Sequence, residues 1–388
     1  MTSEVIWWLL RIAEFIALAY FMLIAVYTIG WYRLKECPTP EKNQNVKTSV
    51  LVATRNEETN ILHLLGSLSQ QDYPKSLTQI VIIDDHSEDD TAEKVNSFSK
   101  LFPDLDIQLI LAEGFGKKSV LSEALVIANG DLVLVTDADC LPPPFWISQM
   151  TACYLAGGYK MLLGPVLLDP ATSLFSRLQV LEFISLMGST AGASGAGLPV
   201  MGNGANMAFD RKAALLAENF DASGQFASGD DVFMLFTFIK KFGRKTIHFV
   251  NSEAAIVTTL PTSDFSAFLQ QRMRWVSKSR GYKNPVIIVP ALIVFLFNFM
   301  LVVLIFSSVI YPFMLLVYVL FLLLKYLIDY PLLHATSGFM RRRNLLKYAL
   351  PLELIYPFYV VGIGILGNII KVKWKGRQME RGKIIKDL

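Results

Sequence analysis

The longest apolar run in the chain, residues 286–329, constrains what the sequence can fold into more than any other feature. Lys325 and Asp329 are its only charged residues. A helix of about 20 apolar residues spans a bilayer, and this run is long enough for two such helices. A break around Ser307 and Pro312 divides the run in two. It therefore predicts a helical hairpin in a membrane.

The N-terminal segment predicts another membrane helix. From Val5 to Tyr32 the chain has only two charged residues, Arg11 and Glu14, which can pair on one helical face. A cleaved signal peptide is the alternative, but its apolar core has about 7–15 residues and a small-residue cleavage site follows it. This segment is longer and lacks such a site. Residues 1–32 are thus predicted to be an N-terminal transmembrane helix.

A third apolar segment, residues 351–370, is harder to orient. Glu353 is its only charged residue, and a proline and three glycines interrupt it. The basic residues 341–343 before it and the basic tail 371–388 after it both favour the cytoplasmic side. One complete crossing cannot satisfy both, so the segment is re-entrant or the number of crossings is even. The membrane region is predicted to cover residues 286–370.

Composition and charge exclude several protein classes. Hydrophobic residues make up 53% of the chain and charged residues 18%, which rules out a disordered chain. The formal net charge is +3, with no basic stripe outside the C-terminal third, so no nucleic-acid partner is expected. The three cysteines, Cys37, Cys140 and Cys153, match neither zinc-site nor disulfide spacing and fit a reducing compartment.

Residues 33–262 alternate apolar strands with helical patterns. The order βαβαβαβ favours a mostly parallel sheet with helices on both faces and a ligand crevice at the carboxyl ends of the strands. Residues 188–204 include six glycines and are expected to form a loop. In chain order, the predicted strands cover 47–54, 78–84, 106–111 and 131–136, and the predicted helices cover 57–70, 88–100 and 117–129.

Polar residues follow the first two predicted strands where those strands end. Thr54, Arg55 and Glu57 open the next helix, where backbone N–H groups can receive a nucleotide. Asp84 and Asp85 end the second strand, and a carboxylate there can accept hydrogen bonds from a pyrimidine imide or from ribose hydroxyls. Helix capping is the competing explanation for both groups.

Two carboxylates one residue apart follow the fourth predicted strand. Asp137 and Asp139 offer hard oxygen ligands that suit Mg²⁺ or Mn²⁺, and like charges this close are unfavourable unless a cation offsets them. We therefore favour a divalent-metal and diphosphate site over a capped turn. Lys117 and Lys118 begin a helix, where cations oppose the helix dipole, which indicates either an anionic partner or a solvated pair.

A pair of adjacent carboxylates lies further along the chain. Asp230 and Asp231 precede an apolar helical pattern that ends at Ile239. The pair offers a candidate general base for an acceptor hydroxyl. Helix capping by Asp230 would explain one of the two acids but not both.

Residues 263–285 carry an amphipathic helical pattern, with an apolar stripe on one side and Arg and Lys opposite. Such a pattern is typical of a helix lying on the cytoplasmic face of a membrane. It contains Gln271, Arg274 and Trp275. The guanidinium of Arg can bind phosphate oxygens, and the ring of Trp offers an apolar face to a sugar. A helix that only anchors the chain is the alternative.

Taken in order, these blocks resemble the membrane-bound family 2 glycosyltransferases, which include cellulose synthases, hyaluronan synthases and ceramide glucosyltransferases. The resemblance covers about residues 45–280 and implies a cytoplasmic GT-A domain, α/β and Rossmann-like, with N-terminal and C-terminal transmembrane helices. It rests on five motifs: Thr54-Arg55-Asn56-Glu57, Asp84-Asp85, Asp137-Ala138-Asp139, Gly229-Asp230-Asp231 and Gln271-x-x-Arg274-Trp275.

The resemblance also implies an inverting, metal-dependent transfer from a nucleotide sugar. Asp85, with Asp84, would lie near the uracil of the donor. Asp139, assisted by Asp137, would hold the Mg or Mn ion on the diphosphate. Asp231 matches the family's catalytic base.

The remaining motif residues would complete the site. Asp230 stands where the family usually has a glutamate, beside the base. Gln271, Arg274 and Trp275 would border the acceptor and the departing diphosphate. The implied partners are a nucleotide-sugar donor, a lipid or glycan acceptor and the lipid bilayer.

The leading interpretation is an integral membrane enzyme, in a bacterial inner membrane, that moves a sugar from a UDP donor to a lipid or lipid-linked acceptor at the cytoplasmic face. A processive polysaccharide synthase is the nearest alternative, although few C-terminal spans are present to form a polymer channel. A transporter or a non-catalytic nucleotide-binding membrane protein is an alternative of another class. The retained Asp231 and the motif around Trp275 argue against it.

Overall fold

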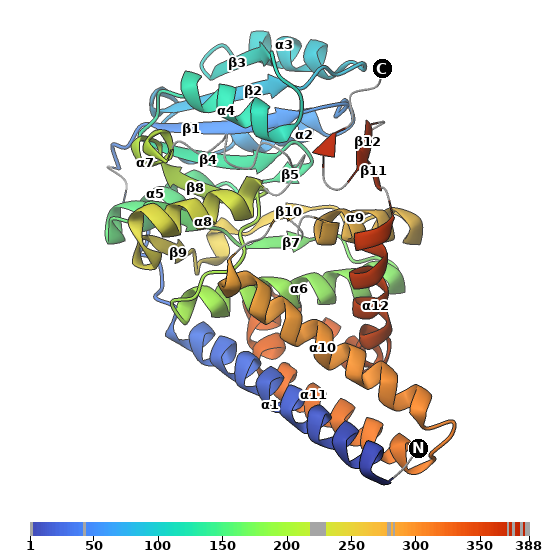
Figure 1. Cartoon of the computed structure of the whole chain (residues 1–388). Helices are drawn as coiled ribbons and strands as arrows, with labels where there is room; N and C mark the ends of the chain where they lie inside the picture. Colours follow the sequence, from blue (N-terminus) through green and yellow to red (C-terminus); the bar gives the residue numbers. More distant parts are fainter. Residues whose placement is uncertain are drawn as a thin grey trace.

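The protein consists of a sheet-containing domain and a bundle of long helices, which lie on opposite sides of helix α6 (Leu174–Gly195) (Figure 1). The N-terminus lies at the end of the bundle farthest from the sheet. The computed structural model describes residues 3–41, 44–217, 230–277, 281, 284–370, 372–374, 377–380 and 383–384.

The main sheet has seven strands in the order β3-β2-β1-β4-β8-β6-β9. The first four are parallel to one another, as predicted, and β8 is antiparallel to both of its neighbours, so the sheet is mixed. The four predicted strands are correct to within one residue. The strands are β1 (Thr48–Thr54), β2 (Thr78–Asp84), β3 (Asp106–Leu111), β4 (Leu132–Asp137), β6 (Met161–Leu163), β8 (Met207–Asp210) and β9 (Ile247–Phe249).

Helices cover both faces of this sheet, as the sequence predicts. Alternate residues of each strand enter different cores: Val50 and Val52 face one core, whereas Leu51 faces the other. The covering elements are α2 (Ile61–Ser69), α3 (Thr91–Leu101), α4 (Lys117–Ile127), α5 (Trp146–Gly157), α7 (Arg211–Leu216) and α8 (Asp230–Phe242). A small second sheet contains β5 (Cys140–Leu141), β10 (Val257–Thr259) and β7 (Val166–Leu168).

The predicted glycine loop is wrong over its first half, because α6 continues to Gly195. Several of its glycines serve a close helix crossing instead. A Cβ atom on Gly192 would lie 2.2 Å from the carbonyl oxygen of Tyr27, and one on Gly195 would lie 2.0 Å from that of Gly30. These glycines let α6 lie directly against the backbone of α1 (Ser3–Arg33).

Four helical segments are long and apolar enough to cross a membrane, by length and hydropathy, within the described part of the chain. The predicted N-terminal helix is α1, and the predicted hairpin consists of α10 (Pro285–Ser307) and α11 (Phe313–Phe339). The fourth joins a 3₁₀ segment, η5 (Arg343–Tyr348), to α12 (Ala349–Ile369). Large apolar side chains such as Phe15, Phe306 and Leu316 stay exposed on the bundle, which fits a lipid environment.

Both ends of α12 meet the sheet-containing side of the protein. Just before α12, Arg342 forms an ion pair with Asp169 at 2.6 Å. At the other end, a Cβ on Gly367 would lie 3.1–3.2 Å from atoms of Val276 and Met273 in α9 (Phe265–Ser277). Contacts with the sheet-containing domain therefore flank α12 at both of its ends.

The linker after α1 is joined covalently to the domain, because Cys37 and Cys153 form a disulfide. The expectation that the cysteines match no disulfide pattern is therefore wrong. Their separation of 116 residues gives no local signature in the sequence, and the pairing depends on α5 packing beside the linker. Cys140 is free and buried.

A buried ion pair joins α9 to α6. Arg272 is 2% exposed and Glu182 is 5% exposed, and their nearest N and O atoms lie 2.5 Å apart. The hydroxyl of Tyr359 in α12 donates to the same carboxylate at 3.1 Å. Burial raises the pKa of Glu182, and the nearby guanidinium acts in the opposite direction. Arg272, on the side of this helix that the sequence predicts to be exposed, is therefore buried against α6.

We predict that Arg272→Met lowers the free energy of unfolding by about 3–5 kcal/mol, because it leaves the Glu182 carboxylate buried without its cation. The double variant with Glu182→Leu should recover much of this loss. Denaturant unfolding in detergent measures both. Lys75→Met is the matched control, since the Lys75–Asp104 pair is about half exposed and its loss should change stability by about 1 kcal/mol or less. Equal effects of the two single substitutions would contradict the prediction.

Candidate active site

Three neighbouring parallel strands bring their carboxyl ends to one edge of the sheet. β1 lies between β2 and β4, and the register sets Thr54 beside Asp84 and Ala53 beside Asp137. Ligand crevices of open α/β sheets lie outside such strand ends. The polar residues that follow these three strands therefore lie together, as the sequence predicts.

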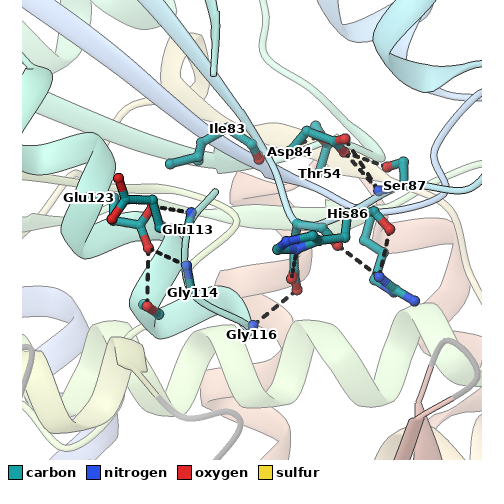
Figure 2. Close-up of polar contacts among 12 residues, drawn as sticks. Thr54, Ile83, Asp84, His86, Ser87, Glu113, Gly114, Gly116 and Glu123 are labelled. Carbon is teal, nitrogen blue, oxygen red and sulfur yellow. Dashed lines mark hydrogen bonds and ion pairs between the residues drawn. The ribbon is translucent and has the colours of Figure 1, made fainter. Parts of the chain in front are cut away.

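Asp84 supports the turn after β2. Its buried carboxylate accepts hydrogen bonds from the backbone N–H of Ser87 at 3.2 Å and from the hydroxyl of Thr54 at 3.3 Å (Figure 2). Glu57 likewise accepts a hydrogen bond from the side-chain amide of Asn60 at 2.8 Å. Both carboxylates thus have local partners of the kind that turn stabilisation requires.

Asp85 and Arg55 join two loops at this edge. The Asp85 carboxylate accepts a hydrogen bond from the backbone N–H of Gly116 at 3.1 Å. The buried guanidinium of Arg55 donates to the carbonyls of Asp85 and His86 at 2.8 and 2.7 Å. The ring of His86 stacks on that of Phe115, with 4.3 Å between centroids. The loop after β2 is therefore held against the loop before α4.

Residues that the sequence does not single out also hold this second loop. Glu123 of α4 accepts hydrogen bonds from the backbone N–H groups of Glu113 and Gly114 at 2.8 and 3.0 Å (Figure 2). Gly116 has a φ of 87°, in the region that favours glycine. The Gly114-Phe115-Gly116 pattern is the signal that marks the loop, whereas nothing in the local sequence singles out Glu123.

Asp137 and Asp139 lie at the end of β4 with Cys140. One ligand atom from each of the three lies within 4.8 Å of the others. Asp137 forms an ion pair with Lys117, and Asp139 is exposed. Burial, and then the carboxylates of Asp139 and Asp137, raise the pKa of the Cys140 thiol, so it stays protonated. The donor set consists of two carboxylates, which fits Mg²⁺ or Mn²⁺.

Asp231 lies near Lys117, with the backbone of Gly204 between them. Its Oδ2 accepts a hydrogen bond from the backbone N–H of Gly204 at 3.3 Å. A Cβ on Gly204 would lie 3.1 Å from the Lys117 Nζ and 4.0 Å from the Asp231 Cβ. The small residue therefore leaves space where the carboxylate at the start of α8 comes near the lysine of α4.

Arg274 brings α9 to this cluster. Burial lowers the pKa of its guanidinium, and the carboxylates of Asp137, Asp231 and Asp139 act in the opposite direction. Arg274 stays charged in any case. Carboxylates from two separate parts of the domain thus act on one guanidinium of the motif helix.

The other residues of that motif contact the buried ion pair. The guanidinium of Arg272 donates to the side-chain oxygen of Gln271 at 3.0 Å and lies 4.2 Å from the ring centroid of Trp275. Trp275 also packs beside Phe183 of α6, with 6.2 Å between ring centroids. Gln271 is therefore held by its own helix, and Trp275 by its own helix and by α6.

Some predicted residues lie at or beyond the limits of the described chain. Asp230 begins α8 and Lys118 lies in the first turn of α4, but their side chains are outside the described part. Gly229 of the same motif is outside the described residues. The residues that the structure brings together are Lys117, Asp137, Asp139, Gly204, Asp231 and Arg274.

Two curated relatives illustrate the sequence similarity. The beta-monoglucosyldiacylglycerol synthase of Trichormus variabilis is 35% identical over 92 residues, which cover 24% of this chain and 20% of the relative. The poly-beta-1,6-N-acetyl-D-glucosamine synthase of Staphylococcus epidermidis is 28% identical over 192 residues, covering 44% and 43%. The matches span less than half the length of the curated relatives.

A solved structure shares the fold over nearly the whole chain. The mannosyltransferase PcManGT from Pyrobaculum calidifontis, in complex with GDP-Man and Mn²⁺, superposes with a TM-score of 0.56 at 16% identity and covers 92% of this chain and 98% of that one. The model of the family described as glycosyltransferase like family 2 matches residues 45–278, which contain the whole cluster of carboxylates and cations. The chain therefore belongs to this glycosyltransferase family, has a GT-A fold and carries apolar helices long enough to cross a membrane.

Proposed function

We propose that the protein transfers a sugar, with inversion, from a UDP-sugar to a lipid or lipid-linked acceptor at the cytoplasmic face of a bacterial inner membrane. One observation carries the proposal. Three carboxylates and two cations meet at the carboxyl edge of the sheet, and one of the cations belongs to a helix that contacts the membrane bundle. A nucleotide sugar and a lipid headgroup could both reach such a place.

The donor nucleotide would bind along the loops after β1 and β2. Asp85 lies at this edge beside Gly116, where its carboxylate could accept the imide N–H of uracil. Asp84 and Arg55 would keep that loop in position through the hydrogen bonds described above. Thr54 and Glu57 would hold the loop after β1 in the same way. Two lysines of α4, Lys117 and Lys118, would attract the anionic phosphates.

Asp137 and Asp139 would hold a divalent cation, Mg²⁺ or Mn²⁺. The two carboxylates are hard oxygen ligands that lie close together at the end of β4. When bound, such an ion would offset the negative charge of the diphosphate leaving group. Lys117 would act beside it, since it already pairs with Asp137.

Asp231 is our candidate for the general base. Its carboxylate is oriented by the N–H groups of Gly204 (3.3 Å) and Val232 (2.9 Å) and comes near Lys117 across the glycine. It would take the proton of the acceptor hydroxyl as that oxygen attacks the sugar. Asp230, its neighbour in the chain, would add negative charge next to it.

The acceptor would approach from the membrane side, past α9. Gln271 and Trp275 are fixed there by Arg272, and Trp275 offers an aromatic face to a sugar or headgroup. Arg274 would contact the diphosphate. The name of the lipid-directed relative agrees with this acceptor class, whereas that of the polysaccharide relative supports a processive synthase as the second candidate.

The deciding experiment is nucleoside diphosphate release by the detergent-purified protein with UDP- and GDP-sugars and a polar lipid extract. Release from one UDP-sugar that requires lipid is the expected result. Analysis of the lipid product separates the two candidates, because one added sugar favours single transfer and a ladder of products favours a polysaccharide synthase. Intact UDP binding with no release from any donor would contradict the proposal and point to a nucleotide sensor.

We predict that Asp231→Asn lowers the turnover number by about 10²–10⁴-fold, the usual contribution of a general base, while the affinity for the nucleotide stays close to that of the wild type. Turnover assays and nucleotide titration by calorimetry measure the two quantities. Asp104→Asn, which alters an exposed carboxylate, is the control. Near-normal turnover by Asp231→Asn would remove this residue as the base.

Asp139→Asn should instead weaken metal-dependent binding of the donor. In the wild type, EDTA should abolish transfer and added Mn²⁺ or Mg²⁺ should restore it. In the variant, UDP affinity should respond little to the metal, because a neutral amide replaces one of the two anionic carboxylate ligands. UDP titrations with and without the metal test this, and an unchanged metal response would exclude Asp139 as a ligand.

A further inference from the structure

Three side chains that commonly bind metals meet where the chain leaves the membrane helix α1. Cys37 follows the end of that helix by four residues, Cys153 lies in α5, and His248 lies in the edge strand β9. Their two sulfur atoms and one imidazole nitrogen all lie within 4.8 Å of one another. The Cys37 sulfur and the His248 Nε2 are 4.0 Å apart. None of the three belongs to the candidate active site.

Contacts other than the disulfide also hold the linker close to α5 and β9. A backbone bridge pairs Glu36 with Asn251, and the side-chain amide of Gln149 donates to the carbonyl of Pro38 at 3.0 Å. The linker is therefore fixed on both sides of its cysteine. Cleavage of the sulfur–sulfur bond would leave the two thiols close to each other.

The imidazole is also oriented. The ring of His248 stacks on that of Tyr159, with 4.4 Å between centroids and 5° between planes. His248 and Cys153 are buried, and Cys37 is half-buried. An oriented, buried histidine beside two cysteines is the arrangement expected of a metal ligand set.

We propose that the reduced forms of Cys37 and Cys153, together with His248, bind a thiophilic divalent cation of the zinc type. Two thiolates and an imidazole suit zinc, and three protein ligands leave a fourth position for water. That the two cysteines are reduced in the cell rests on the proposed function, which places this domain in the cytoplasm, where disulfides do not persist. The metal-binding capacity itself does not depend on the glycosyl transfer.

The chemistry balances with a dithiol reductant of the thioredoxin type. It gives two electrons and two protons to the disulfide, becomes a disulfide itself and leaves two thiols on the protein. Binding of the metal then releases the two thiol protons to water. The bound ion would tie the linker to α5 and to β9 at once, and so fix where α1 leaves the sheet-containing domain.

The test uses the full chain in detergent, reduced with a dithiol and freed of metal by a chelator. Cadmium titration should produce one equivalent of a thiolate-to-metal charge-transfer band in the ultraviolet, and zinc should displace it. Cys37→Ser should abolish the band, and His248→Gln should weaken zinc binding by at least about tenfold. Cys37 is half-buried in a linker, so its serine variant should fold.

Two controls separate this group from the active-site carboxylates. Asp139→Asn and Cys140→Ser should both keep the cadmium band, because neither residue belongs to the proposed set. The proposal is overturned if the reduced wild type gives no band, if Cys37→Ser keeps it, or if the disulfide resists the dithiol. Because the readout is spectroscopic, it stands or fails separately from sugar transfer.

Discussion

The ion pair between Arg272 and Glu182 determines where the motif helix α9 sits. Two opposite charges that are almost fully buried require each other, because either alone would be strongly unfavourable in the interior. This requirement fixes the rotation of α9 about its axis. Arg274 lies two residues further on and is thereby directed at the active-site carboxylates. The hydroxyl of Tyr359 in α12 donates to the same Glu182 carboxylate, so a helix of the membrane region helps to hold α9 beside the candidate active site.

Helix α12 is held in the bundle by a second buried cation, Lys325. Lys325 of α11 is 1% exposed and pairs with Asp329 at 2.7 Å and with Glu353 of α12 at 2.5 Å. Tyr20 of α1 donates to the Asp329 carboxylate at 2.8 Å. Charges inside a membrane segment are tolerated when they are paired in this way. Helix α12 therefore contributes a side chain to each of two buried ionic groups, Tyr359 to the Arg272–Glu182 pair and Glu353 to the Lys325–Asp329 pair.

The sequence predicts the elements well and the contacts between them poorly. The parallel strands are β-branched runs bounded by polar turns, so their limits are evident, and the acidic residues after them meet because parallel strands end at one edge. The glycines around Gly192 look like a loop, since nothing local indicates that α1 packs on them. The Cys37–Cys153 bond and the burial of Arg272 were missed for the same reason. Each depends on a partner more than 80 residues away in the chain.

Charge balance links the acidic motifs to one another. Three carboxylates, those of Asp137 and Asp139 at the end of β4 and that of Asp231 at the start of α8, lie near two cations, Lys117 and Arg274. Among the described side chains of this cluster, the negative charges outnumber the positive ones, and an anionic diphosphate adds more negative charge. Without a compensating ion, donor binding would place like charges close together in partly buried surroundings. A divalent cation between the strand-end carboxylates and the phosphates would restore the balance. The proposed metal therefore follows from the whole cluster and not only from the spacing of two aspartates.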